Sequence, residues 1–298
     1  MDDYGDSTDV ETGGNDIEDG NNEAGSMENV VETTEVNNVS ETNDVQAQWN
    51  VSEYSNTVQK DIVTENVNSM ENLGFMTGRV SESISTYSKE VYDSKYNTTG
   101  ENILGHHDMK DGSIHVINEY EPAAKHTVTH EIFHKSSYQH ESLEEIENGY
   151  IASRKSGLLE INNSFDKEGN YISSNEEGRA LNEGITEMKT LDYLNSKGEI
   201  ESAEMFNAYS DSVNVSRQLN DIVGKDVVDS AYFGGSKEEL VNEVNRLAKD
   251  ENAWSKLNAD LETATYSKNI DERNAALSRI DNMMNTMMET KELENENS

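Results

Sequence analysis

The spacing of hydrophobic and polar positions predicts a change of structure along the chain. Residues 1 to about 50 carry few large hydrophobic side chains. Apolar residues then recur every three or four positions from Tyr54 to Leu73, which predicts a first helix. Short β-prone runs follow between about 78 and 118, and helical spacing returns at about 122–138 and 176–196. The chain therefore combines strands and helices after a polar start.

Two turn signals predict hairpins within this pattern. Asp111-Gly112 joins the β-prone runs 103–105 and 113–117. A polar turn at 166–169 separates Leu158–Ile161 from Tyr171–Ser173. From about 200 to 290 all apolar spacing is helical. Short strands around one helix, followed by further helices, are typical of an α+β fold with a helical C-terminal lobe.

The polar N-terminal segment also concentrates negative charge. Residues 1–59 contain 15 acidic residues and no basic one, and Gly, Asn, Ser, Thr and Glu dominate there. Such a segment cannot bury enough apolar surface to offset its chain entropy, so residues 1–50 are predicted to form a disordered acidic tail. The remaining residues, 51–298, are numerous enough for one domain with two lobes.

The charge of the chain restricts the kinds of molecule that it can bind. The chain has 60 acidic and 23 basic side chains, a formal net charge of −37, and it keeps −22 when the 15 acidic residues of the first 59 positions are left out. A surface of this charge repels nucleic acid and anionic membranes. There is no cysteine, no secretory signal and no run of about 18 apolar residues. We expect no membrane span and a cytoplasmic protein by default, with export by a route that needs no such signal left open.

The strongest chemical signal is the H-E-x-x-H motif at residues 130–134. On a helix, positions i and i+4 lie about 40° apart on one face, so His130 and His134 can reach one metal ion. Glu131, one position after the first histidine, is placed to take a proton from a water at that ion. Pro122, the only proline of the chain, predicts a helix start upstream. The apolar residues of this helix predict an amphipathic element with a face turned away from the histidines.

A third histidine, His126, lies four residues before the motif. Eight residues of helix, about 12 Å, separate it from His134, so these two side chains cannot share an ion. A pair of His126 and His130 is conceivable, but Thr127 follows His126 and offers no base. We therefore predict His130 and His134 as ligands and His126 as a polar neighbour.

Two imidazoles need a third donor to form a catalytic zinc site. On the second predicted helix, one stripe contains Ala180, Glu183, Gly184, Glu187, Leu191 and Leu194. Glu183 and Glu187 interrupt a face that otherwise favours burial, and a buried carboxylate needs a partner such as a metal ion. We predict Glu183 as the third ligand. Gly184 predicts a close approach of this helix to the first metal helix.

The two motifs together, His130-Glu131-x-x-His134 and Asn182-Glu183-x-x-x-Glu187, resemble those of the gluzincin, thermolysin-like group of zinc metallopeptidases. The resemblance covers about residues 75–195. It implies that Zn²⁺ is held by His130, His134 and Glu183, and that Glu187 holds the outer nitrogen of His130. The family often has Asp at the position of Glu187, so a longer side chain stands here.

The same resemblance implies a fold and a mode of substrate binding. The expected architecture is zincin-like, with a small mixed sheet packed on the metal-binding helix. The sheet and metal helices would occupy about 75–196, and the helical lobe about 200–290. In the family a strand just before the metal helix lies antiparallel to the substrate backbone, and residues 113–118 match that position.

These observations predict a zinc-dependent endopeptidase that acts on peptide or protein substrates. Glu131 would be the general base, and a Tyr or His of the helical lobe is expected to stabilise the oxyanion. Tyr232, near Gly234-Gly235, is the candidate, with Tyr193 and Tyr209 as competitors. The alternatives are a regulatory protease with one protein target and a non-catalytic acidic binding module. The acidic tail would have a further use if it covered the cleft and inhibited the enzyme. The sequence leaves the oligomeric state open.

Overall fold

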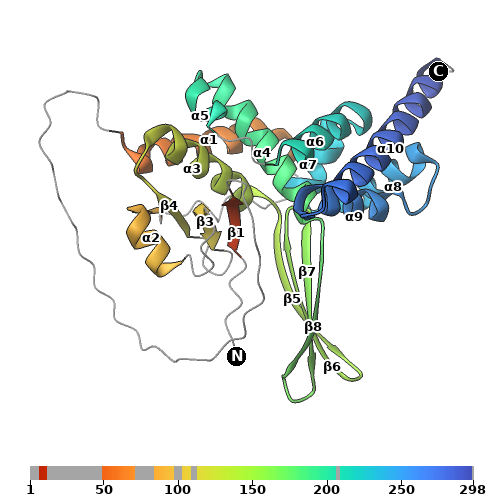
Figure 1. Ribbon diagram of the computed structural model, residues 1–298, viewed down its shortest axis with the longest axis horizontal. Helices are drawn as coiled ribbons and strands as arrows, with labels where there is room; N and C mark the ends of the chain where they lie inside the picture. The colour runs from red at the N-terminus through yellow and green to blue at the C-terminus, as the bar shows by residue number, and fades with distance from the viewer. Residues whose placement is uncertain are drawn as a thin grey trace, which may run out of the picture.

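The computed structural model describes residues 7–11, 49–70, 84–96, 103–108, 113–205 and 209–296. Within these residues the chain forms ten helices and two four-stranded sheets. The predicted α+β fold class is confirmed at this level (Figure 1).

The first sheet has the strand order β1-β3-β4-β2, formed by β1 (Ser7–Glu11), β2 (Ile84–Tyr87), β3 (Ile103–Asp108) and β4 (Ile114–Ile117). β3 pairs antiparallel with β1 and β4, whereas β2 and β4 are parallel. The predicted hairpin over 103–117 is confirmed as the β3–β4 pair, although its turn lies outside the described residues. Helix α2 (Lys89–Lys95) contacts β2 and β4, and helix α3 (Glu121–Ser136) packs on β3 and β4.

Successive side chains of β4 point to opposite faces of the sheet and lie in two different environments. Ile114 and Val116 belong to the main hydrophobic core, which includes α3. His115 points the other way, where its Nδ1 atom lies 3.1 Å from the hydroxyl of Tyr87 and 3.2 Å from that of Tyr96. The imidazole of His115 is therefore part of the packing beneath α2.

Residues 113–118 do not form a free edge of the sheet, which the resemblance implied for a strand that binds the substrate backbone. β4 has β3 on one side and β2 on the other, so both of its edges are already paired. The edge strand beside β3 is β1, whose residues fall within the segment predicted to be a disordered tail. Residues 12–48 of that segment lie outside the described part of the chain.

The second sheet is a four-stranded antiparallel meander that leaves the body of the molecule between α3 and α4 (Figure 1). Its strands, in sheet order, are β5 (Gln139–Ile146), β6 (Gly149–Ser156), β7 (Leu159–Asp166) and β8 (Tyr171–Glu177). The second predicted hairpin corresponds to β7 and β8, whereas β5 and β6 were not predicted. Leu143, Ile146, Tyr171 and Ile172 are exposed on this sheet.

The remaining helices are α1 (Val51–Met70), α4 (Arg179–Ser196), α5 (Ile200–Glu204), α6 (Ser210–Val223), α7 (Lys225–Gly234), α8 (Lys237–Ala248), α9 (Ala253–Tyr266) and α10 (Ile270–Glu296). α1 packs on α3, α3 packs on α4, and α4 packs in turn on α6 and α9. α10 covers α8 and α9, and buries Met284 and Met287 in the main core. None of the described helices is both long and apolar enough to span a membrane.

Two features of the metal helices differ from the predictions. Helix α3 is not amphipathic, because every residue from His126 to Lys135 is buried among β3, β4, α1, α4 and α5. The close approach to α4 at Gly184 is made by α6 and not, as predicted, by α3. A Cβ atom at Gly184 would lie 2.5 Å from the carbonyl oxygen of Ser212, so the missing side chain lets α6 approach α4.

Candidate metal centre

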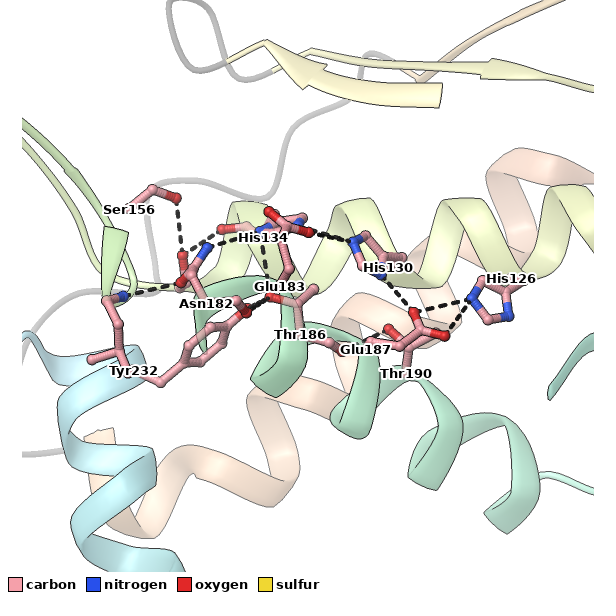
Figure 2. A network of polar contacts seen from close by, with 12 residues as sticks. His126, His130, His134, Ser156, Asn182, Glu183, Thr186, Glu187, Thr190 and Tyr232 are labelled. Carbon is pink, nitrogen blue, oxygen red and sulfur yellow. Dashed lines mark hydrogen bonds and ion pairs between the residues drawn. The ribbon is translucent and has the colours of Figure 1, made fainter. Parts of the chain in front are cut away.

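Two neighbouring helices bring three donor atoms together (Figure 2). His130 and His134 stand one turn apart on α3, with their Nε2 atoms 2.9 Å apart. The Oε2 atom of Glu183, on α4, lies 3.3 Å from Nε2 of His130 and 3.1 Å from Nε2 of His134. All three side chains are buried. The structure thus joins the three residues that the sequence predicted as ligands.

The spacing of these atoms fits a small metal ion. Zinc binds nitrogen and oxygen at about 2.0–2.2 Å in a tetrahedral arrangement, which places its ligand atoms about 3.3 Å from one another. The three distances here are 2.9, 3.1 and 3.3 Å. His130, His134 and Glu183 therefore form a group that could hold a metal ion.

Glu187 supports the first histidine from behind. Its Oε2 atom lies 2.9 Å from Nδ1 of His130. Because a carboxylate accepts hydrogen bonds, Nδ1 of His130 carries a proton, which leaves Nε2 as the ring nitrogen that can bind an ion. The contact that the resemblance implied for Glu187 is present, despite the longer side chain.

Thr186 supports the second histidine, and sequence reasoning missed it. Its Oγ1 atom lies 3.3 Å from Nδ1 of His134 and donates a hydrogen bond to the carbonyl oxygen of Asn182 at 2.9 Å. The side-chain oxygen of Asn182 accepts a hydrogen bond from the backbone of Leu158 at 3.0 Å. Thr186 lies three residues after Glu183 on the same helix face, which is the signal that could have identified it.

Tyr232, the predicted oxyanion residue, lies against Thr186. Its hydroxyl lies 2.7 Å from Oγ1 of Thr186, and the side chain has no exposed surface. Because Thr186 sits at the outer nitrogen of His134, Tyr232 lies on the side of that ring away from the metal-facing nitrogen (Figure 2). The hydroxyl of Tyr232 thus contacts the residue that supports His134.

The two competing tyrosines differ in position. Tyr193 donates a hydrogen bond to Asp61 of α1 at 3.2 Å, away from the donor group. The ring of Tyr209 stacks on that of His130, with centroids 6.5 Å apart and planes 19° from parallel. Tyr209 is partly exposed, unlike the histidine beneath it. Of the three tyrosines considered, only Tyr209 lies directly against a donor histidine.

A second group of donors overlaps the first. His126, His130 and Glu187 also place one potential ligand atom each within 4.8 Å of one another. The two groups share His130, which faces the first through Nε2 and the second through Nδ1. If an ion were bound by the first group, Nδ1 of His130 would keep its proton and its hydrogen bond to Glu187. The second group would then hold His130 in place for the first.

No protein-family model, curated protein or solved structure matches this chain. The assignment of the centre therefore depends on the motif spacing and on the contacts described above.

Opposite charges dominate the electrostatics of the buried centre. Burial alone would lower the pKa of His130, but its hydrogen bonds to Glu183 and Glu187 outweigh this effect and raise the pKa to about 10. Burial would raise the pKa of Glu187, but His126 and His130 lower it to about 2. Contacts with His134 and His130 likewise hold the pKa of Glu183 well below its ordinary range, against the effect of burial. Both carboxylates are thus ionised at neutral pH and suited to a cation.

Proposed function

We propose that this protein is a zinc-dependent endopeptidase of the gluzincin type, with a zincin-like arrangement of α3, α4 and the first sheet. The observation that carries the proposal is the convergence of His130, His134 and Glu183 around one point, with Glu131 adjacent to the first histidine. Two imidazoles and one carboxylate are a donor set typical of catalytic zinc. The substrates would be peptides or proteins.

Each residue of the centre would have a distinct task. When bound, zinc acts as a Lewis acid that polarises a carbonyl group and brings the pKa of a water close to 7. Glu131 would take the proton of the attacking water and deliver it to the leaving amine. Glu187 and Thr186 would keep His130 and His134 oriented through their outer nitrogens. Tyr209 would donate a hydrogen bond to the developing oxyanion.

The variant Glu131→Gln tests this proposal. Because the amide cannot accept the proton of the water, peptide cleavage should fall by about 10²–10⁴-fold. Zinc content, measured by elemental analysis, should remain that of the wild type, since residue 131 is not a ligand. Glu144→Gln, an exposed residue of β5, is the matched control and should cleave normally. A Glu131→Gln variant that cleaves a peptide library as fast as the wild type would refute the mechanism.

A protease with a single protein target is the second candidate, and the burial of the centre favours it. His130, Glu131 and His134 have no exposed surface, and Glu183 is only 2% exposed. A substrate would have to open this centre, which a dedicated partner can do through contacts elsewhere on the molecule. Digestion of casein separates the two candidates: rapid digestion supports the broad enzyme, whereas cleavage confined to a few sequences of a peptide library supports the narrow one.

A further inference from the structure

His126 connects two helices through its two ring nitrogens. The side chain is fully buried, and its Nδ1 atom lies 2.9 Å from the carbonyl oxygen of Ser202 in α5. Its Nε2 atom lies 3.1 Å from each carboxylate oxygen of Glu187. Both ring nitrogens therefore face hydrogen-bond acceptors. His126, on α3, is held between Ser202 on α5 and Glu187 on α4.

Glu187 is bound from two sides. Nε2 of His126 lies 3.1 Å from each of its carboxylate oxygens, and Nδ1 of His130 lies 2.9 Å from Oε2. Only 1% of Glu187 is exposed, so water cannot replace either contact.

We propose that His126 is a positioning residue of the metal centre, which holds Glu187 in place and thereby orients His130. The inference depends on the proposed function, because it takes His130, His134 and Glu183 as the ligands. The order of contacts is Ser202, His126, Glu187, His130, and each link is a hydrogen bond of 2.9–3.1 Å. Partners of this kind typically alter metal affinity by about 10–100-fold.

The competing explanation is that the ion itself binds between His126, His130 and Glu187. Nδ1 of His130 would then have to lose its proton and turn its lone pair to the ion. The two explanations assign different importance to Glu183, which belongs only to the first donor group. Substitutions at residues 126 and 183 therefore distinguish them.

The experiment compares four variants of the full chain by zinc competition against a chromogenic chelator. His126→Phe keeps a planar ring but removes both hydrogen bonds, and His126→Gln restores one donor toward Glu187. We expect zinc affinity to fall about 10–100-fold in His126→Phe and less in His126→Gln, whereas Glu183→Gln should lose binding almost completely. His106→Phe is the control, since His106 is buried beside Tyr92 beneath α2 and should leave the affinity unchanged.

The absorption spectrum of the cobalt-substituted protein provides a second readout. If His126 is a positioning residue, His126→Phe should give the same tetrahedral spectrum as the wild type. It should need a higher cobalt concentration to reach it. Loss of that spectrum in His126→Phe, with binding kept in Glu183→Gln, would overturn the inference in favour of the competing site. Equal zinc affinity in the wild type and in both residue 126 variants would also overturn it. A wild-type protein that binds no zinc would instead refute the proposed function.

Discussion

The Oε2 atom of Glu183 lies 3.1 Å from Nε2 of His134, although 49 residues separate them in the chain. This contact joins two helices whose connection is a complete four-stranded sheet. It also makes the third donor of the candidate metal centre dependent on the packing of α4 against α3.

Replacing Glu183 should therefore remove metal with little effect on the fold. Structural zinc sites contribute about 10–16 kcal/mol in total, so one of three protein ligands is worth roughly 4 kcal/mol, or about a 1,000-fold change in affinity. Glu183→Gln keeps the shape of the side chain. Zinc titration should show the loss, and circular dichroism should show unchanged helix content. Glu177→Gln, at the end of β8, is the control and should bind zinc as the wild type does.

Tyr209 and Tyr232 should respond differently to the same substitution. Tyr209→Phe should lower kcat by about 10²–10³-fold with zinc affinity unchanged, because it would remove an oxyanion donor. Tyr232→Phe should cost about 1 kcal/mol of stability through the lost bond to Thr186, and it should retain most activity. Steady-state kinetics and thermal denaturation measure both effects. The reverse pattern would restore Tyr232 as the oxyanion residue.

Gly184→Ala tests the contact between α4 and α6. The added methyl group would lie 2.5 Å from the carbonyl oxygen of Ser212, so the helices must move apart. Overpacking of this kind typically costs about 1–3 kcal/mol, despite the higher helix propensity of alanine. Urea denaturation should detect the loss. Asn195→Ala, exposed near the end of the same helix, should change stability by less than about 0.5 kcal/mol.

The metal-free protein should lose stability at alkaline pH. The pKa of His130 rises from 6.5 to about 10 on folding, so its contribution is complete below pH 6.5 and is lost as the pH approaches 10. The pKa of Glu187 falls from 4.5 to about 2, so its contribution is complete above pH 4.5 and is lost toward pH 2. Melting temperatures with a chelator present should thus be highest between these limits. Zinc should abolish the alkaline loss, because it replaces the proton on His130.

Deletion of residues 1–11 tests the hypothesis that the acidic segment inhibits the proposed peptidase. β1 pairs antiparallel with β3, where an extended peptide could otherwise add to the sheet. β3 also contacts the metal helix, because a Cβ atom at Gly105 would lie 2.5 Å from the side chain of Thr127. We expect the shortened protein to cleave long peptides faster, with equal zinc content. Unchanged rates would exclude this role of β1.

Much of the candidate metal centre could be predicted because its residues follow regular spacings within single helices. His130 and His134 are related by one helical turn, and Glu183 and Glu187 interrupt an otherwise apolar stripe by the same spacing. Periodicity of this kind depends only on helix geometry. The order of the helices after residue 200 was predictable for the same reason.

Other features depend on contacts between distant segments. The role of His126 requires Ser202, and the use of Gly184 requires Ser212; each partner lies on another helix that sequence spacing cannot place. β5 and β6 were missed because the meander is solvated over much of both faces, so that polar and apolar residues do not alternate clearly along its strands. The full burial of α3 escaped prediction because Thr127, Thr129 and Lys135 are polar residues in an enclosed helix.

The meander leaves and rejoins the body at one place. The backbone nitrogen of Gly157 donates to the carbonyl oxygen of Tyr138 at 2.7 Å, and Glu177, at the end of β8, pairs with Glu160. Hairpins can gain or lose residue pairs at their far turns while this base stays intact. The length of the projecting strands can consequently change without moving the donor residues on α3 and α4. Changes in strand length during evolution would therefore alter how far the meander extends and leave the donor group of His130, His134 and Glu183 in place.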